Sequence, residues 1–197
     1  MATSTRSLAA SVLLVACSSA AAQEPGQLPI QLTAEGGLRF DSQKGMVEYD
    51  GVTITQGQIR ITADRAKTTV GEFEDSKWQF SGTVRITMPD STLASDTAEV
   101  KFAGGEIESA AVTGAPATFE QQRAAERAQG RANRIDYDLK RGTIELAGDA
   151  WLSDGQKEIT GETLVYNTAN QSVLSKQQVT ITIQPGEEPK AGPKPDP

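Results

Sequence analysis

The residues best suited to chemistry in this sequence are three carboxylates that recur at matching places along it. Asp64, Asp96 and Glu162 each directly follow a small residue. Two acids that flank a sugar at about 5 to 9.5 Å are the machinery of a glycosidase, so a carbohydrate-active enzyme is one hypothesis. Trp78 and Trp151 could stack on a sugar, although packing against a neighbouring strand is favoured. Because acids at regular spacing also serve chain bends and solubility, we expect a structural role for all three.

Most other catalytic and metal-binding designs lack their residues. The sequence contains no histidine and a single cysteine, Cys17. Nucleophilic Cys/His and Ser/His sites and ordinary zinc sites are therefore excluded. Gly104 and Gly105 precede no Lys-Ser/Thr pair, so they predict a turn rather than a phosphate-binding loop. We predict that the protein is not an enzyme and has no catalytic residues, no metal and no cofactor.

Charge limits the partners further. The formal net charge is -7 at pH 7, and the sequence has no basic cluster. Such a chain is not drawn by charge to nucleic acid or to anionic membrane surfaces. We therefore expect no nucleic-acid partner.

The first residues are typical of an export signal. Arg6 precedes an apolar run over residues 8–16, and three alanines end at Ala22. This pattern predicts a signal peptide over residues 1–22 and an exported protein of the cell envelope. Cleavage before Cys17, with lipidation of that residue, is the competing interpretation and would tether the protein to a membrane. Cleavage after Ala22 is favoured.

Apolar and polar residues alternate through most of the remaining chain. The pattern is clear at Phe80, Val84 and Ile86, and again at Val179, Ile181 and Ile183. A period of two predicts β-strands with one apolar face. We predict an all-β domain over residues 30–184, a short linker over 23–29 and a disordered Pro/Glu/Lys tail over 185–197.

A repeat underlies these strands. Glycines that follow an apolar-x step recur roughly every thirty residues, at Gly51, Gly82, Gly114 and Gly148. The apolar parity often flips at a small-residue step that follows each glycine, which indicates a bulge or bend at the same place in every strand. Such bends fold an antiparallel sheet over on itself, with an apolar groove inside and an open strand edge at each end. Residues 120–129 lack an apolar stripe and are expected to form a loop or a short helical turn.

Several segments in this order resemble a known family over nearly the whole mature chain. They are PIQLTAE (29–35), IRITADRA (59–66), GTVRIT (82–87), IDYD (135–138) and GETLVYN (161–167). The sequence resembles the OstA-like family of LptA, the periplasmic bridge proteins of lipopolysaccharide transport. This resemblance implies a twisted, V-shaped antiparallel β jelly roll of repeated strand pairs.

The resemblance also implies a function in outer-membrane biogenesis. The interior of such a jelly roll would hold the acyl chains of lipopolysaccharide, and copies would stack head to tail between inner- and outer-membrane transport components, joined by edge-strand pairing. A homo-oligomer is therefore expected. The residues expected to line the lipid-binding groove are Ile61, Phe80, Val84, Ile86, Val100, Phe102, Ile135, Tyr137, Leu146, Leu152 and Tyr166. The expected edge-strand contacts are Ile30, Leu32, Val179 and Ile181.

Three other interpretations remain at this point. The predicted groove residues are also what an ordinary core requires, so a purely structural or assembly protein of the envelope fits the same pattern. An inner-membrane-associated relative with the same fold is another alternative, although the short apolar signal argues against it. The glycosidase hypothesis is the third.

Overall fold

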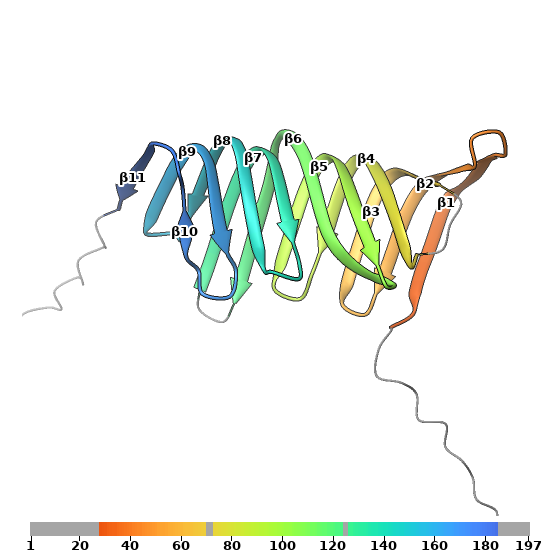
Figure 1. Ribbon diagram of the computed structural model, residues 1–197, viewed down its shortest axis with the longest axis horizontal. Helices are drawn as coiled ribbons and strands as arrows, with labels where there is room; N and C mark the ends of the chain where they lie inside the picture. The colour runs from red at the N-terminus through yellow and green to blue at the C-terminus, as the bar shows by residue number, and fades with distance from the viewer. Residues whose placement is uncertain (1–27, 70–72, 124–125, 185–197) are drawn as a thin grey trace, which may run out of the picture.

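The computed structural model describes residues 28–69, 73–123 and 126–184, and the regular elements in them are β-strands (Figure 1). The strands are β1 (Ile30–Asp41), β2 (Met46–Gln56), β3 (Ile59–Thr69), β4 (Asp75–Thr87), β5 (Ser91–Ala103), β6 (Glu106–Arg123), β7 (Glu126–Asp138), β8 (Thr143–Ser153), β9 (Lys157–Asn167), β10 (Val173–Leu174) and β11 (Val179–Ile183). Among these residues no helix is long and apolar enough to cross a membrane. The predicted signal peptide, Cys17, most of the predicted linker and the predicted tail lie outside the described residues.

The strands form one antiparallel sheet in which β1 to β10 follow one another in sequence order. β11 returns to pair with β9 over residues 157–161, while β10 pairs with Val165 and Tyr166 of the same strand. The sheet is therefore open, with β1 at one edge and β10 and β11 sharing the other. The prediction of an antiparallel all-β protein built from strand pairs is confirmed.

The long strands bend near their middle, where the pairing register shifts in each neighbouring pair from β1 to β9 except β2 with β3. Shifts lie between Ala34 and Gly37, Thr62 and Arg65, Ser81 and Val84, Ala94 and Thr97, Thr113 and Ala117, Arg131 and Arg134, and Ala147 and Ala150. Because these shifts are aligned across the sheet, the sheet folds over along one line into two layers (Figure 1). The predicted bulges and the V-shaped jelly roll are confirmed.

We call the two layers arm A and arm B. Arm A comprises residues 30–34, 52–56, 59–62, 84–87, 91–94, 117–123, 126–131, 150–153, 157–161 and 179–183, and arm B comprises residues 37–41, 46–50, 65–69, 75–81, 97–103, 106–113, 134–138, 143–147, 163–167 and 173–174. The hairpin turns lie at the ends of the arms away from the bends. We call the line where the two sets of hairpins face each other the mouth.

The repeat glycines lie at the bends. Gly51, Gly82 and Gly148 have φ values of 63°, 74° and 77°, which a residue with a side chain rarely adopts. Gly114 is the exception, with no positive φ; a cis peptide between Ala115 and Pro116 follows it. Asp64, one of the three recurrent acids, has a structural role at a bend. Its Oδ2 accepts a hydrogen bond of 3.3 Å from Thr83 Oγ1, beside Gly82.

Replacing Gly82 with alanine is expected to destabilise the protein for two separate reasons. The left-handed conformation costs a residue with a side chain about 1–3 kcal/mol. A Cβ at Gly82 would also lie 2.3 Å from Asp64 Oδ2 and 2.9 Å from Asp64 Cβ, which adds a clash of about 1–3 kcal/mol. Urea unfolding measures the loss. Gly45→Ala is the matched control, because Gly45 has a φ of 59° and nothing within 4 Å of the added Cβ. Equal losses in both variants would contradict the clash.

The prediction that residues 120–129 form a loop or a short helical turn is wrong. β6 continues to Arg123 and β7 begins at Glu126. Among the side chains that the structure describes here, Gln121 and Ala128 are buried whereas Gln122 and Arg127 are exposed. Burial therefore alternates with a period of two, as in a strand. Pairing of these strands with β5 and β8 overrides the helical preference of the Ala, Gln, Glu and Arg residues.

Candidate functional site

One row of apolar side chains crosses the inner face of arm A from edge to edge. Directly opposed residues in neighbouring strands share a face, so the register identifies the row. It runs through Leu32, Ile54, Ile61, Ile86, Leu93, Phe119, Gly130, Leu152, Ile159 and Ile181. Its first member lies on β1 and its last on β11. The inner face of arm A is therefore apolar along the whole length of the sheet.

Arm B carries two such rows. The row nearer the bends consists of Leu38, Tyr49, Ala66, Phe80, Ala98, Val112, Ile135, Leu146 and Leu164. The row nearer the mouth consists of Phe40, Val47, Thr68, Trp78, Val100, Ala110, Tyr137, Ile144, Tyr166 and Val173. Thr68 is the polar member. The arms thus enclose a continuous apolar interior that reaches both edges.

The predicted groove residues all lie in this interior. Each is buried, from Ile61, Val100, Phe102, Ile135 and Leu146 at 0% exposure to Tyr137 at 8%. Most belong to the three rows, and Val84 and Phe102 are buried beside them. The arms meet closely, because a Cβ added to Gly130 of arm A would lie 2.7 Å from Leu146 Cδ2 of arm B. The interior is thus a packed core in this structure.

Aromatic rings fill the interior near the β1 end. Trp78 stacks on Phe73 at 4.8 Å and on Tyr49 at 5.7 Å between ring centroids, and Phe80 and Phe102 complete the cluster. Trp151 is different, since it lies outside the apolar rows on arm A. Its ring lies 4.6 Å from Arg131 Cζ, and its Nε1 donates to Glu158 Oε2 at 3.3 Å. Both tryptophans have protein partners, in line with the packing interpretation.

Buried polar side chains collect along the mouth. They are Gln56, Thr68, Ser91, Gln121, Ser153 and Thr168. Each lies at or beside a hairpin. The sequence pattern gives no sign of a role for these residues, because a Gln or Ser near a turn is typical of an exposed position. The interior is thus apolar between the arms and polar along the mouth.

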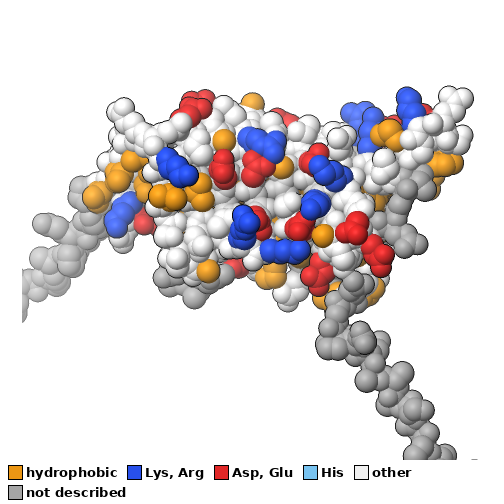
Figure 2. All heavy atoms as spheres, in the orientation of Figure 1, with side chains coloured by type: hydrophobic (Ala, Val, Ile, Leu, Met, Phe, Trp, Pro, Cys, Tyr) orange, Lys and Arg blue, Asp and Glu red, His pale blue; other side chains and the backbone are white. Residues whose placement is uncertain are grey.

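The two ends of the sheet expose apolar residues. Of the predicted edge contacts, Ile181 is 57% exposed, whereas Ile30, Leu32 and Val179 are partly buried against the core. Other apolar side chains, which were not predicted as edge contacts, are also exposed at the ends: Leu28, Leu38, Phe40, Leu174 and Ile183. Figure 2 shows apolar side chains at both ends of the molecule. The alternation of Leu38 and Phe40 around Arg39 indicates a strand, but it does not show that the strand lies at the end of the sheet.

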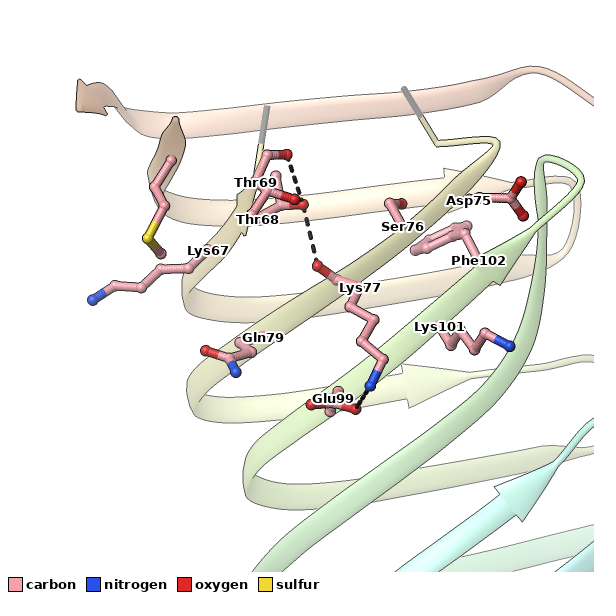
Figure 3. Close-up of a pocket in the computed structure, with 11 residues that line it drawn as sticks. Lys67, Thr68, Thr69, Asp75, Ser76, Lys77, Gln79, Glu99, Lys101 and Phe102 are labelled. Atoms are coloured by element: carbon pink, nitrogen blue, oxygen red, sulfur yellow. Dashed lines mark hydrogen bonds and ion pairs between the residues drawn. The ribbon is translucent and has the colours of Figure 1, made fainter. Parts of the chain in front are cut away.

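The outer face of arm B is polar, and many of its charges form ion pairs. A pocket of about 470 Å³ there is lined by Lys67, Lys77 and Lys101 (Figure 3). Lys67 pairs with Glu48 at 3.3 Å, Lys77 with Glu99 at 3.1 Å, and Lys101 with Glu108. Cationic and anionic side chains alternate across the middle of the molecule in Figure 2. The lysines around this pocket are therefore neutralised by neighbours.

Glu108 is the carboxylate most affected by this network. Hydrogen bonds from Lys101 and from Lys140, the latter at 2.9 Å, lower the pKa of Glu108 to about 2. Lys140 responds with a raised pKa, caused first by its hydrogen bond to Glu108. Arg134 likewise has a raised pKa because Asp136 accepts two hydrogen bonds from its guanidinium. These groups stay charged at neutral pH and serve as a solvated ion-pair surface.

The three recurrent acids do not form a catalytic pair on an inner surface. Asp64, Asp96 and Glu162 are exposed and lie at the bends. Within the described residues no group of three or more Asp, Glu, His or Cys side chains is placed to hold a metal ion. The site is an enclosed apolar surface, bordered by buried polar side chains along the mouth.

Comparison with known proteins identifies the family of this chain. The family model described as LptA/(LptD N-terminal domain) LPS transport protein matches residues 66–172, more than half of the chain. The chain belongs to this family. The lipopolysaccharide export system protein LptA of Haemophilus influenzae is 26% identical over 184 residues, which cover 90% of each chain.

A solved structure is also similar to this member of the LptA family. It is the crystal structure of LptH from Pseudomonas aeruginosa, described as the LptA homologous periplasmic component of the lipopolysaccharide transport device. The match covers 80% of this chain and 96% of that one, at 19% identity and a TM-score of 0.42.

Proposed function

We propose that this protein carries lipopolysaccharide across the periplasm by holding its acyl chains between arms A and B. The observation that carries the proposal is the set of apolar rows on the inner faces of the two arms. These rows stay on the inner face from β1 to β10 and β11. Each methylene kept from water is worth about 0.8 kcal/mol. A lipid crossing an aqueous compartment therefore needs an apolar environment along its entire path, which rows of this kind supply.

The proposed transport requires no catalytic step in this chain. The interior offers shape and apolar surface, so the lipid can move along it without a change in the number of methylenes exposed to water. Energy for directed movement must come from partner proteins. We infer that these are the inner-membrane components of lipopolysaccharide transport, with outer-membrane components receiving the lipid.

We further propose that copies of the chain join head to tail. Among the described residues, β1 has no partner strand on one side, and β10 and β11 form the opposite edge of the sheet. Pairing of β1 in one copy with β11 and β10 in the next would place Leu32 beside Ile181, and Phe40 beside Val173, so the apolar rows would continue across the junction. The same edges would join the membrane-bound components at the two ends of the bridge.

Photo-crosslinking in cells tests the lipid proposal. A photoreactive residue at Ile86, 2% exposed on the inner face of arm A, is expected to form an adduct with lipopolysaccharide. Phe102 on arm B is a second interior site. Arg85 is the matched control, since it precedes Ile86 in the same strand and is exposed. Folded variants that form no adduct at either interior site would favour the purely structural role and overturn the proposal.

A further inference from the structure

A side-chain hydrogen bond joins the two arms near the β1 end of the mouth. Gln56, at the arm A end of β2, donates from Nε2 to the backbone oxygen of Gly105 at 2.6 Å. Gly105 lies in the β5–β6 hairpin, at the end of arm B. Nε2 also lies 3.3 Å from the backbone oxygen of Leu28. Gln56 is 7% exposed, so this contact is shielded from water.

A second hydrogen bond joins the arms farther along the mouth. The hydroxyl of Tyr166 on arm B donates to Gln121 Oε1 on arm A at 2.9 Å, and both side chains are buried. Gln121 Nε2 donates to Asp90 Oδ2 at 3.3 Å, which fixes the orientation of the amide. The ring of Tyr166 also lies 6.0 Å from that of Phe119 across the interior. The two side-chain contacts thus close the mouth at separate places along the sheet.

These contacts obstruct an amphiphile in a way that the apolar interior does not. Apolar contacts between the arms are non-directional and can be replaced by contacts with an acyl chain. A lipopolysaccharide, however, has acyl chains that belong between the arms and sugars that belong in water. The covalent link between the two must cross the line of the mouth. Movement along the sheet therefore requires each closed point of the mouth to open in turn.

We propose that Gln56 with Gly105, and Gln121 with Tyr166, are two successive latches that open to admit and pass the lipid. The inference rests on the proposed function, because it specifies how the same interior is gated. Opening does not leave the amide and the phenol without partners, since the ester, amide, phosphate and hydroxyl groups at the sugar–acyl junction can replace the lost hydrogen bonds. The latch residues are positioning residues for the lipid junction.

The double variant Gln121→Leu with Tyr166→Phe tests the second latch. It removes both partners and keeps the site filled, which is milder than leaving one buried polar group unpaired. Tyr166→Phe alone, which keeps the hydrogen bond from Gln121 Nε2 to Asp90, is the fallback if the double variant folds poorly. Gln79→Leu is the matched control, because Gln79 is exposed on the outer face of arm B.

Two measurements are made on each protein, with Cys17 replaced by serine. Spin labels at Gln156→Cys and Ala169→Cys, in exposed turns at opposite ends of β9, report the width of the mouth without lipid. Uptake of fluorescently labelled lipopolysaccharide reports its opening. In the double variant we expect a broader, longer distance distribution and uptake about two- to tenfold faster. Gln79→Leu should change neither.

The outcomes separate the latch from the proposed function. An unchanged distance distribution in the double variant overturns the latch, whether or not lipid binds. A wider mouth without faster uptake overturns its role as a gate. If the wild-type protein takes up no lipopolysaccharide, the proposed function fails, while a wider mouth in the double variant still supports the latch as a closure between the arms.

Discussion

Phe119→Ala is expected to lower the free energy of unfolding by about 3–5 kcal/mol. Phe119 is fully buried in the apolar row of arm A, between Leu93 and Gly130. Gly130 has no side chain to move into the space, and Tyr166 is held by its hydrogen bond to Gln121. The cavity can therefore collapse only partly. Urea unfolding measures the loss, which is large against a usual domain stability of about 5–15 kcal/mol.

Phe40→Ala is the matched control for this variant. It makes the same chemical change on the inner face of arm B, but Phe40 is at the edge strand and 55% exposed. Its truncation is expected to change the stability of the isolated chain by about 0.5 kcal/mol. Equal losses for Phe40 and Phe119 would show that the interior is not packed as described.

The fold was predictable because strand periodicity and bend chemistry are both local. Alternation at Phe80, Val84 and Ile86 identifies a strand and its inner face without any knowledge of the partner strands. Gly82 and Gly148 need a conformation that few other residues adopt, so their recurrence locates the bends. A small-residue step beside each glycine completes the signal, as Ala63-Asp64 does opposite Gly82.

The buried polar residues along the mouth were not predictable because their positions depend on contacts between segments far apart in sequence. Gln56 and Gly105 are 49 residues apart, and Gln121 and Tyr166 are 45 apart. Nothing local distinguishes a latch glutamine from an exposed one. The polar composition of residues 120–129 even concealed the strand that carries Gln121, whose burial follows from pairing with Ser91 and Ala128.

The edges were predicted at the level of the strand but not of the residue. Ile30, Leu32 and Val179 follow the period of two of the edge strands, but their side chains are partly buried against the core of the same copy. Leu38 and Phe40 lie beyond the bend of β1, where no further strand of the described part of the chain covers arm B. Their exposure follows from the end of the sheet, which a strand pattern alone does not locate.

A charge at either end is expected to weaken self-association at least tenfold, with little effect on the stability of one copy. Phe40→Asp places a carboxylate on the exposed inner face of β1, and Ile183→Asp does so on β11, where Ile183 is 67% exposed. An unpaired charge buried at a junction is costly. Sedimentation equilibrium over a concentration series measures the change. Thr182→Asp is the control, because Thr182 lies on the opposite face of β11 and leaves the backbone edge intact.

Mixing the two variants distinguishes head-to-tail assembly from a symmetric dimer. In a head-to-tail array each variant keeps one intact end, so Phe40→Asp and Ile183→Asp should each remain monomeric alone but form a dimer together that cannot grow. A symmetric contact between two β1 edges would instead be abolished by Phe40→Asp and unaffected by Ile183→Asp. That second result would contradict the proposed bridge, because symmetric pairs would turn the apolar rows back on themselves and could not extend them across a compartment.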